Sequence, residues 1–212
     1  KDVPQLQLPE AAMAQVLSKY GLTPQSYVVM VPGAEYGSAK RWPAAHFADL
    51  ATALMTSAIK KEATQRVISV LLLGSGKEAE ICAGIEAAIQ ASFLPTADMS
   101  GRLINLAGKT NLMEAFALIA GARQVVSNDT GLMHVAAALH VKQVAVFGSS
   151  SPEHTPPLSD AASVIWLKND PTYQPALDCA PCFERACPLG HLRCLNDLTP
   201  QRVLAAMTSQ YD

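Results

Sequence analysis

Short apolar runs alternate with longer segments of helical period along most of the 212-residue chain. Continuous apolar runs are typical of strands that are covered on both faces, as in parallel sheets. The predicted strands are residues 27–31, 66–73, 104–106, 124–127, 144–147 and 163–167. The predicted helices are residues 11–19, 43–54, 78–91, 112–120, 132–139 and 199–207. This alternation predicts an α/β fold, a doubly wound and mostly parallel sheet.

The expected organisation is a linker with a leading helix in residues 1–25, followed by one domain in residues 26–212. The chain starts "KDVPQLQLPEAA" without Met, which we interpret as a piece of a longer protein. A net charge of −2 gives no basic excess for binding nucleic acid. No apolar stretch reaches the roughly 18 residues of a membrane span, and no secretory signal is visible.

Ligands of doubly wound sheets bind beyond the carboxyl ends of the strands, so the loops there are the candidate sites. The first such loop reads "PGAEYGSAKRWP", residues 32–43. Gly33 and Gly37 allow close backbone approach, and Lys40 places a cation just before a helix. This combination favours a phosphate site. The alternative is an ordinary surface loop with a solvated Lys-Arg pair.

Two further loops carry weaker signals. "GSGKEA", residues 74–79, fits a G-x-G-x-x-A dinucleotide pattern but follows the second strand and lacks a later acidic residue. It is equally well a tight turn, in which Glu78 could meet a ribose. "AGKT", residues 107–110, is not a phosphate-binding P-loop, because Leu103 stands where that motif needs glycine.

The fourth loop, "SNDTGLMH", runs from a strand straight into a helix. Asp129 is expected to be the N-cap, while the amides of Thr130 and Gly131 face outward toward an anion. His134 falls off the apolar stripe, whose expected members are Leu132, Val135, Ala136 and Leu139. A well-capped helix without a ligand is the alternative. The fifth loop, "GSSSPEHTPPL", is polar and stiffened by proline, and could close over a ligand.

Four of the five cysteines fall in one short segment, as Cys179-x2-Cys182-x4-Cys187-x6-Cys194. Four thiols beginning with C-x-x-C suit a tetrahedral zinc site. Disulfides or free thiols are the alternatives. In either case we expect a structural role, because the segment is remote in sequence from the candidate loops.

Four segments in order carry a resemblance: "PGAEYGSAKRWP", "VVSNDTGLMHVAAAL", "GSSSPEHTPP" and "LTPQRVL". Together they closely resemble the ADP-heptose:lipopolysaccharide heptosyltransferases of glycosyltransferase family nine. The resemblance implies the two-domain GT-B fold, with this chain as its Rossmann-like C-terminal half from about Tyr27. That half binds the nucleotide-sugar donor. The N-terminal half, outside this chain, binds the lipid A–core acceptor and supplies a catalytic Asp.

The resemblance also implies roles for single residues. Lys40 contacts phosphate and Asp129 lies near the donor sugar, so these two are the catalytic candidates. The implied donor-binding set is Gly33, Lys40, Ser75, Glu78, Gly108, Lys109, Thr110, Asp129, Thr130, Gly131 and His134.

The implied reaction is inverting transfer of heptose from ADP-heptose to the lipopolysaccharide inner core, with no cofactor required. It is expected at the cytoplasmic face of the bacterial inner membrane, to which the enzyme is peripheral, and the isolated chain is expected to be inactive. Two other functions stay open. One is a nicotinamide-dependent oxidoreductase, based on residues 74–79, and the other is a zinc-stapled interaction module, based on the cysteines.

Overall fold

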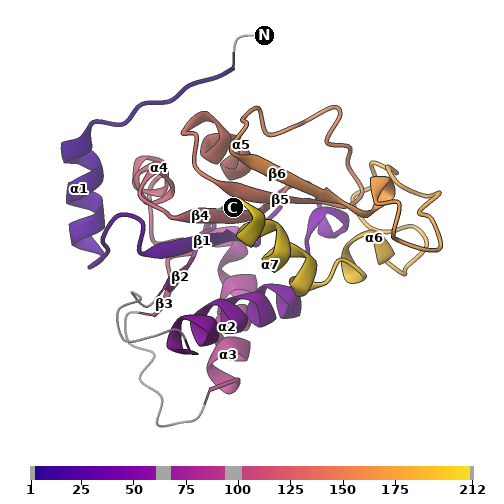
Figure 1. The fold of residues 1–212 in the computed structure, drawn as a ribbon, viewed down its shortest axis with the longest axis horizontal. Coiled ribbons are helices and arrows are strands. Elements are labelled where there is room, and N and C mark those ends of the chain that lie inside the picture. Colours follow the sequence, from indigo (N-terminus) through magenta and orange to yellow (C-terminus); the bar gives the residue numbers. More distant parts are fainter. Residues whose placement is uncertain (1–2, 61–67, 94–101, 211–212) are drawn as a thin grey trace.

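A six-stranded parallel sheet forms the centre of the protein in the computed structural model, which describes residues 3–60, 68–93 and 102–210 (Figure 1). The strands are β1 (Tyr27–Val31), β2 (Ser69–Leu72), β3 (Leu103–Asn105), β4 (Gln124–Asn128), β5 (Gln143–Phe147) and β6 (Ala162–Trp166). Their order is β3-β2-β1-β4-β5-β6, and each neighbouring pair is parallel. This is the order of the Rossmann fold.

Helices cover both faces of the sheet (Figure 1). One face carries α1 (Glu10–Lys19), α4 (Leu112–Ala120) and α5 (Gly131–Ala138). The other carries α2 (Ala44–Lys60), α3 (Ala79–Ala91) and α7 (Pro200–Ser209). Four short elements lie in the connections: η1 (Ser38–Lys40), η2 (Gly76–Glu78), η3 (Leu167–Asn169) and α6 (Arg193–Asn196). The doubly wound α/β fold is therefore confirmed.

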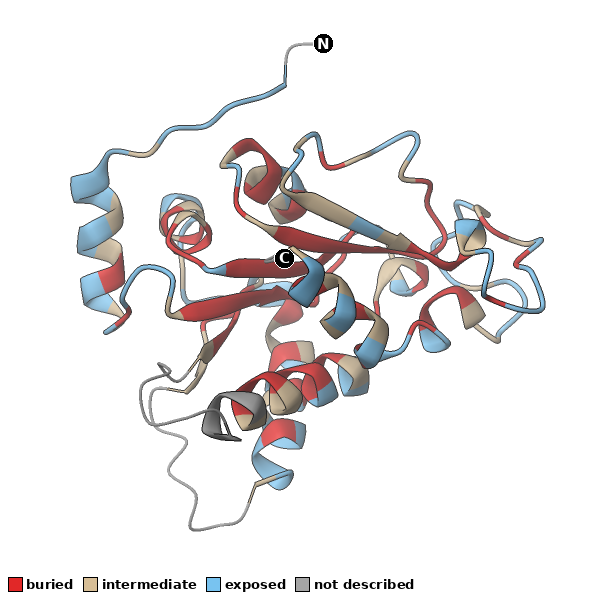
Figure 2. Ribbon diagram, viewed as in Figure 1, coloured by how far each residue is buried: buried red, intermediate tan, exposed pale blue. Residues whose placement is uncertain are grey.

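The continuous apolar runs have the expected physical cause. Every residue of β1, β4 and β5 is buried (Figure 2), because these central strands have helices on both sides. Along β1, Val28 and Met30 face the core under α2 and α3, whereas Val29 and Val31 face the core under α1 and α4. The hydroxyl of Tyr27 is buried too, and it donates to the carbonyl oxygen of Leu118 at 2.6 Å.

Several predicted boundaries shift by a few residues. The predicted strand 66–73 is β2, Ser69–Leu72, with residues 66 and 67 lying outside the described residues. The turn Gly76–Glu78 precedes α3, and α7 continues to Ser209. Asn111 is the N-cap of α4, in a capping box with Glu114. The helix α6 was not predicted.

The strand order reverses direction between β1 and β4. Two crossover connections leave β1 and β4 in opposite directions across the sheet, so a crevice opens between the loops that follow these strands. The loop 32–43 follows β1 and residues 129–130 follow β4. The fold thus brings the first and fourth candidate loops together, although about 90 residues separate them in the chain.

Candidate functional site

A cavity of about 500 Å³ opens at the carboxyl ends of β1 to β4. It is lined by Val31, Gly33, Glu35, Leu73, Gly74, Ser75, Glu78, Thr110, Asn111, Leu112, Ala115, Phe116, Thr130, Gly131, Leu132 and Val135. Six of these belong to the predicted donor-binding set: Gly33, Ser75, Glu78, Thr110, Thr130 and Gly131. The remaining wall is largely apolar, a typical lining for a site that holds an organic ligand.

An ion pair joins the loop after β1 to the end of β4. Lys40 Nζ lies 2.6 Å from Asp129 Oδ2, and the two side chains are 18% and 6% exposed. The Lys40 ammonium also lies 5.1 Å from the centre of the Tyr36 ring, within cation–π range. Lys40 is therefore held in place before any ligand arrives.

Asp129 is not the N-cap of α5, contrary to the sequence prediction. Thr130 is the N-cap and makes no side-chain capping bond. The Asp129 carboxylate turns to Lys40 instead, because an ammonium from the neighbouring loop competes for it more strongly than the helix amides do. The first turn of α5 is left without a side-chain cap at the cavity wall, and its amides and dipole are a favourable environment for an anion.

The apolar stripe predicted for α5 is partly wrong. Ala136 is buried, but Leu132, Val135 and Leu139 are only partly buried, and Leu132 and Val135 line the cavity. Met133, which is outside the predicted stripe, is as fully buried as Ala136.

Asn128 positions the first loop, and the sequence prediction missed it. Its fully buried side chain accepts from the backbone N–H of Trp42 at 3.0 Å and donates to the carbonyl oxygen of Pro32 at 2.7 Å. The indole N–H of Trp42 donates in turn to Leu198. These bonds fix both ends of the loop that carries Lys40. The signal was a polar residue at the end of an apolar strand.

Glu78 supports the loop from the opposite side. Its Oε2 accepts from the backbone N–H of Ser75, the other half of a capping box that starts η2. A Cβ atom on Gly33 would lie only 2.5 Å from the Glu78 Cγ, so the backbone after β1 and this side chain are in direct contact. Glu78 is buried and forms part of the cavity wall. One of its carboxylate oxygens, Oε2, accepts hydrogen bonds from Ser75 within the same turn.

A second acidic residue of the wall, Glu35, was not predicted. Its Oε1 lies 2.6 Å from Lys77 Nζ, and the hydrogen bond to Lys77 lowers the pKa of Glu35 and raises that of Lys77. Both side chains are about three-quarters exposed, so the pair links the loops after β1 and β2 only weakly.

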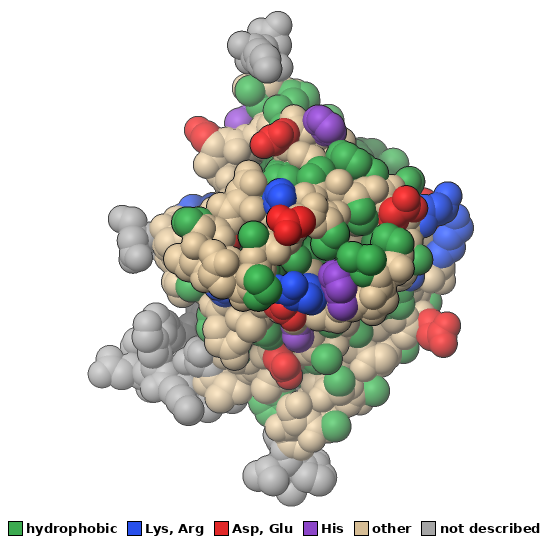
Figure 3. Space-filling model, turned by 90° about the vertical axis from the view of Figure 1, so that its right-hand side faces the viewer, with side chains coloured by type: hydrophobic (Ala, Val, Ile, Leu, Met, Phe, Trp, Pro, Cys, Tyr) green, Lys and Arg blue, Asp and Glu red, His purple; other side chains and the backbone are tan. Residues whose placement is uncertain are grey.

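Figure 3 views the molecule from the side toward which the strands' carboxyl ends point. Cationic and acidic groups are interspersed there with hydrophobic ones.

Five predicted site residues do not line the cavity: Lys40 and Asp129, which form their ion pair outside its lining, and Gly108, Lys109 and His134. Lys109 is exposed and its ammonium donates to the carbonyl oxygen of Asn105. Gly108 has a φ of +72° and packs against Gly76, so it serves the turn between β3 and α4. His134 is exposed on α5. Their neighbour Thr110 does line the cavity.

The four clustered cysteines line a second, much smaller cavity of about 20 Å³. All five cysteines of the chain are free thiols in the structure. Burial first, and then the neighbouring Cys179, Cys182 and Cys187, raise the pKa of the Cys194 thiol to about 12. Within the described residues, no three His, Cys, Asp or Glu side chains already stand in a metal-binding arrangement.

The cysteine segment is not remote from the first loop in space. The carbonyl oxygen of Arg185 accepts from the backbone N–H of Ala39 at 3.1 Å, and the hydroxyl of Tyr36 donates to the carbonyl oxygen of Phe183 at 2.9 Å. A Cβ atom on Gly37 would lie 2.2 Å from that Arg185 oxygen, so only glycine permits this approach. The segment between Cys182 and Cys187 therefore packs directly on the loop that carries Lys40.

None of the helices in residues 3–60, 68–93 and 102–210 combines the length and apolar character that crossing a bilayer takes.

Comparison with known proteins agrees with this geometry. The family described as Glycosyltransferase family 9 (heptosyltransferase) matches residues 1–193. Lipopolysaccharide heptosyltransferase 2 of Salmonella typhimurium is 39% identical over 207 residues, which are 97% of this chain and 53% of that protein. Lipooligosaccharide heptosyltransferase 2 of Haemophilus influenzae is 41% identical over 169 residues, 77% of this chain and 44% of that protein.

Among solved structures, the ADP-heptose lipopolysaccharide heptosyltransferase II of E. coli matches with a TM-score of 0.76 and 38% identity. That match covers 98% of this chain and 53% of the E. coli chain, so the chain spans about half the length of the relatives it matches. The two alternative functions, an oxidoreductase and a zinc-stapled module, find no support in these relatives. The chain belongs to glycosyltransferase family 9, the heptosyltransferases.

Proposed function

We propose that the 500 Å³ cavity binds the nucleotide part of an ADP-heptose donor. The observation that carries this proposal is the position of the uncapped N-terminus of α5, which lines the cavity next to the Lys40–Asp129 pair. Helix amides and a preset ammonium suit a pyrophosphate. The E. coli relative that is 38% identical to this chain is named for ADP-heptose.

The two ends of the cavity suit the two ends of the nucleotide. Leu112, Ala115 and Phe116 give an apolar wall, against which a nucleobase can pack. Thr130 and Gly131 lie on the side of Lys40 and suit the phosphates. Between them, Ser75 and Glu35 offer polar groups to the ribose. The base thus lies at α4 and the pyrophosphate at the crevice between β1 and β4.

The whole protein is proposed to transfer heptose to the lipopolysaccharide inner core with inversion. The acceptor hydroxyl, deprotonated by a base outside this chain, attacks the anomeric carbon in line, and the bond to the ADP oxygen breaks. Negative charge builds up on the leaving pyrophosphate. Lys40 and the α5 amides stabilise that charge, as preorganised groups that need no rearrangement during the reaction and no metal cofactor.

Asp129 has a different role in this proposal. Its carboxylate holds Lys40 at the crevice in the absence of donor. When the pyrophosphate binds, the ammonium can share its three donors between Asp129 and a phosphate oxygen. In this proposal the carboxylate also accepts hydrogen bonds from the heptose hydroxyls and so orients the sugar.

The acceptor half of the site is proposed to lie outside these 212 residues, because the relatives are about twice as long. That half would contact the lipid A–core acceptor at the cytoplasmic face of the inner membrane.

Titration calorimetry of the chain with ADP, ADP-heptose, UDP and NAD tests the donor proposal. We expect ADP and ADP-heptose to bind more tightly than UDP or NAD. Equal affinity for UDP would contradict the assignment of adenine as the nucleobase of the donor. Preferential binding of NAD would indicate a dinucleotide-binding site instead.

A transfer assay with the isolated chain tests whether the catalytic base lies outside these 212 residues. Heptose transfer by this chain alone would show that the catalytic base lies within it, contrary to the proposal.

A further inference from the structure

Four thiols converge on one cavity that has room for a single small species. Cys179, Cys182, Cys187 and Cys194 all line it, and its volume of about 20 Å³ is near that which holds one water molecule. Cys179 and Cys182 come from an irregular segment, whereas Cys194 lies in the first turn of α6. The fold therefore brings these side chains, which lie up to 15 positions apart in the chain, to the wall of one small cavity.

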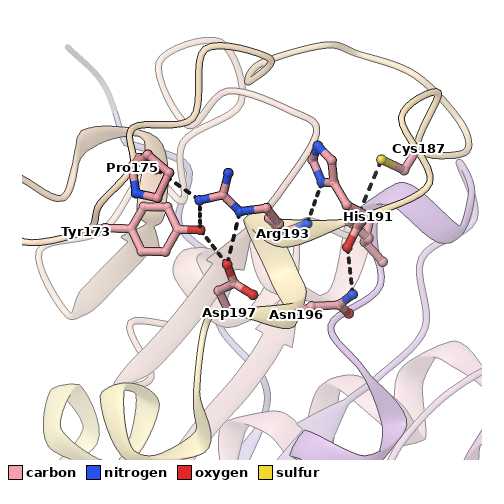
Figure 4. Close-up of polar contacts among 8 residues, drawn as sticks. Tyr173, Pro175, Cys187, His191, Arg193, Asn196 and Asp197 are labelled. Atoms are coloured by element: carbon pink, nitrogen blue, oxygen red, sulfur yellow. Dashed lines mark hydrogen bonds and ion pairs between the residues drawn. The ribbon is translucent and has the colours of Figure 1, made fainter.

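A backbone N–H group beside the cavity forms a hydrogen bond with one of the cysteine sulfur atoms. The N–H of Leu192 donates to the Cys187 Sγ at 3.3 Å, drawn as the dashed line from that sulfur in Figure 4. Leu192 has a φ of +46°, and Phe183, directly after Cys182, has a φ of +56°. Such conformations are costly for residues with a Cβ and persist where surrounding structure requires them.

A separate hydrogen-bond network makes the segment rigid. The Arg193 guanidinium donates to the Tyr173 hydroxyl at 2.8 Å and to the Pro175 carbonyl oxygen at 3.0 Å, and it pairs with Asp197 (Figure 4). The side-chain amide of Asn196 donates to the His191 carbonyl oxygen. The turn that presents Cys187 and Cys194 is thus fixed by neighbours that are not thiols.

A buried hydroxyl borders the same cavity. Ser149 lines it, is 1% exposed, and its Oγ has no hydrogen-bond partner in the described part of the chain. Buried polar atoms usually have partners, so this hydroxyl is available to form a hydrogen bond with a species in the cavity.

We propose that the four cysteines bind one zinc ion. Zinc in structural sites takes four tetrahedral ligands, and four thiolates are a preferred set. Each thiol releases its proton to solvent as its zinc–sulfur bond forms. The described thiols do not yet stand in a metal-binding arrangement, so zinc binding would require them to turn inward about χ1, the one torsion that each cysteine side chain has. The Leu192 N–H then remains as a hydrogen bond to a bound thiolate, which orients the ligand.

The zinc site supports the loop that carries Lys40. The segment between Cys182 and Cys187 provides the Phe183 and Arg185 carbonyl oxygens that hold Tyr36 and Ala39. Zinc, by tying both ends of that segment, keeps the two contacts in place. The effect of zinc on donor binding rests on the proposed donor site, whereas zinc binding itself does not.

The first experiment measures metal in the full chain purified without chelators. Elemental analysis is expected to give about one zinc per chain. Cys182→Ser should lose the zinc, while Cys82→Ala, a buried cysteine on α3 outside the cluster, should keep it. The absence of zinc from the wild type would overturn the proposal, as would disulfides among the four cysteines in non-reducing mass spectrometry. Stoichiometric iron would overturn the choice of zinc.

A second measurement avoids variants that fail to fold. Titration of the reduced, metal-free wild type with Co²⁺ alone should produce the visible bands of a tetrahedral thiolate site at one equivalent. Bands of octahedral Co²⁺ only would overturn the site.

A third measurement separates the site from the donor proposal. Removing zinc with a chelator should weaken ADP binding several-fold, and readded zinc should restore it. If zinc binds but ADP affinity is unchanged by its removal, the support of the Lys40 loop is wrong while the metal site stands. If the zinc-loaded chain does not bind ADP at all, the proposed function has failed and the metal site has not.

Discussion

Lys40 Nζ and Asp129 Oδ2 lie 2.6 Å apart and join the two loops on either side of the crevice between β1 and β4. The two residues are 89 positions apart in the chain. Their ion pair joins two separate motifs in one site, because the Asp129 carboxylate fixes the position of the Lys40 ammonium. The order in which the parallel strands are arranged makes this contact possible.

Replacing Lys40 tests the pyrophosphate assignment. Lys40→Ala should weaken ADP binding by roughly 1–3 kcal/mol, the value of a charge-assisted hydrogen bond. Calorimetry with ADP measures the change. Lys77→Ala is the matched control, because Lys77 is an exposed lysine that pairs with Glu35 at the cavity rim. Unchanged ADP affinity of Lys40→Ala would remove Lys40 from the site.

A double-mutant cycle on unfolding measures the ion pair itself. Asp129→Ala and Lys40→Ala should each lower the free energy of unfolding, since each leaves a largely buried charge without its partner. The double variant should be more stable than the sum of the single losses predicts, by about 0.5–3 kcal/mol. Additive losses in urea denaturation would mean that the two charges are not coupled.

The Asn128 side chain is expected to be worth more to stability than any other polar group at the site. Asn128→Ala leaves the Trp42 N–H and the Pro32 carbonyl oxygen buried without these partners. The expected loss is roughly 2–6 kcal/mol of unfolding free energy, at about 1–3 kcal/mol for each of the two unsatisfied groups. Ser127→Ala is the control, because the adjacent Ser127 hydroxyl is buried without a partner in the described residues. Equal losses in the two variants would argue against the loop-fixing role.

The sheet could be predicted because its central strands obey a local rule. β1, β4 and β5 are buried on both faces, so their apolar runs are visible without knowledge of the partners. The capping box at Asn111 is equally local, since both partners lie within three residues. Such features depend on neighbours in sequence, and the three central strands were predicted correctly to within a residue or two.

The errors concern contacts between distant segments. Asp129 has the right type and position for an N-cap, but the fold brings Lys40 within reach and the carboxylate binds it instead. The packing of Arg185 on Gly37 and Ala39 joins positions about 150 residues apart, so the cysteine segment looked remote from the site. Sequence spacing carries no information on such pairs until the strand order is known.

Adding a methyl group to Gly33 tests the contact between the first loop and Glu78. The new Cβ atom would meet the Glu78 Cγ at 2.5 Å, so the carboxylate or the loop must shift. Gly33→Ala should therefore weaken ADP binding, measured by calorimetry, more than it lowers the melting temperature. In Gly76→Ala the new Cβ atom would meet no atom within 4 Å, and this variant should bind ADP as the wild type does. Normal binding by Gly33→Ala would show that the wall tolerates the shift.

The burial of the His46 imidazole predicts how the stability of the protein depends on pH. Its Nδ1 is buried without a partner in the described residues, and its ring packs edge-on against Trp42. Burial lowers the pKa of His46 below its ordinary value of 6.5, against smaller opposing effects of Asp49 and the Leu198 carbonyl. The unfolded chain then binds more protons than the folded chain in the window just below pH 6.5.

The contribution of His46 to stability is consequently complete above about pH 6.5 and is lost as the pH falls through the folded pKa. Urea denaturation of wild type and His46→Gln between pH 5 and 8 should show a smaller loss on acidification in the variant, because glutamine does not titrate. His140→Gln is the control, since the His140 side chain is 45% exposed. Its curve should lose stability toward acid pH as the wild type does. Parallel curves for wild type and His46→Gln would mean that the neutral imidazole is not favoured by folding.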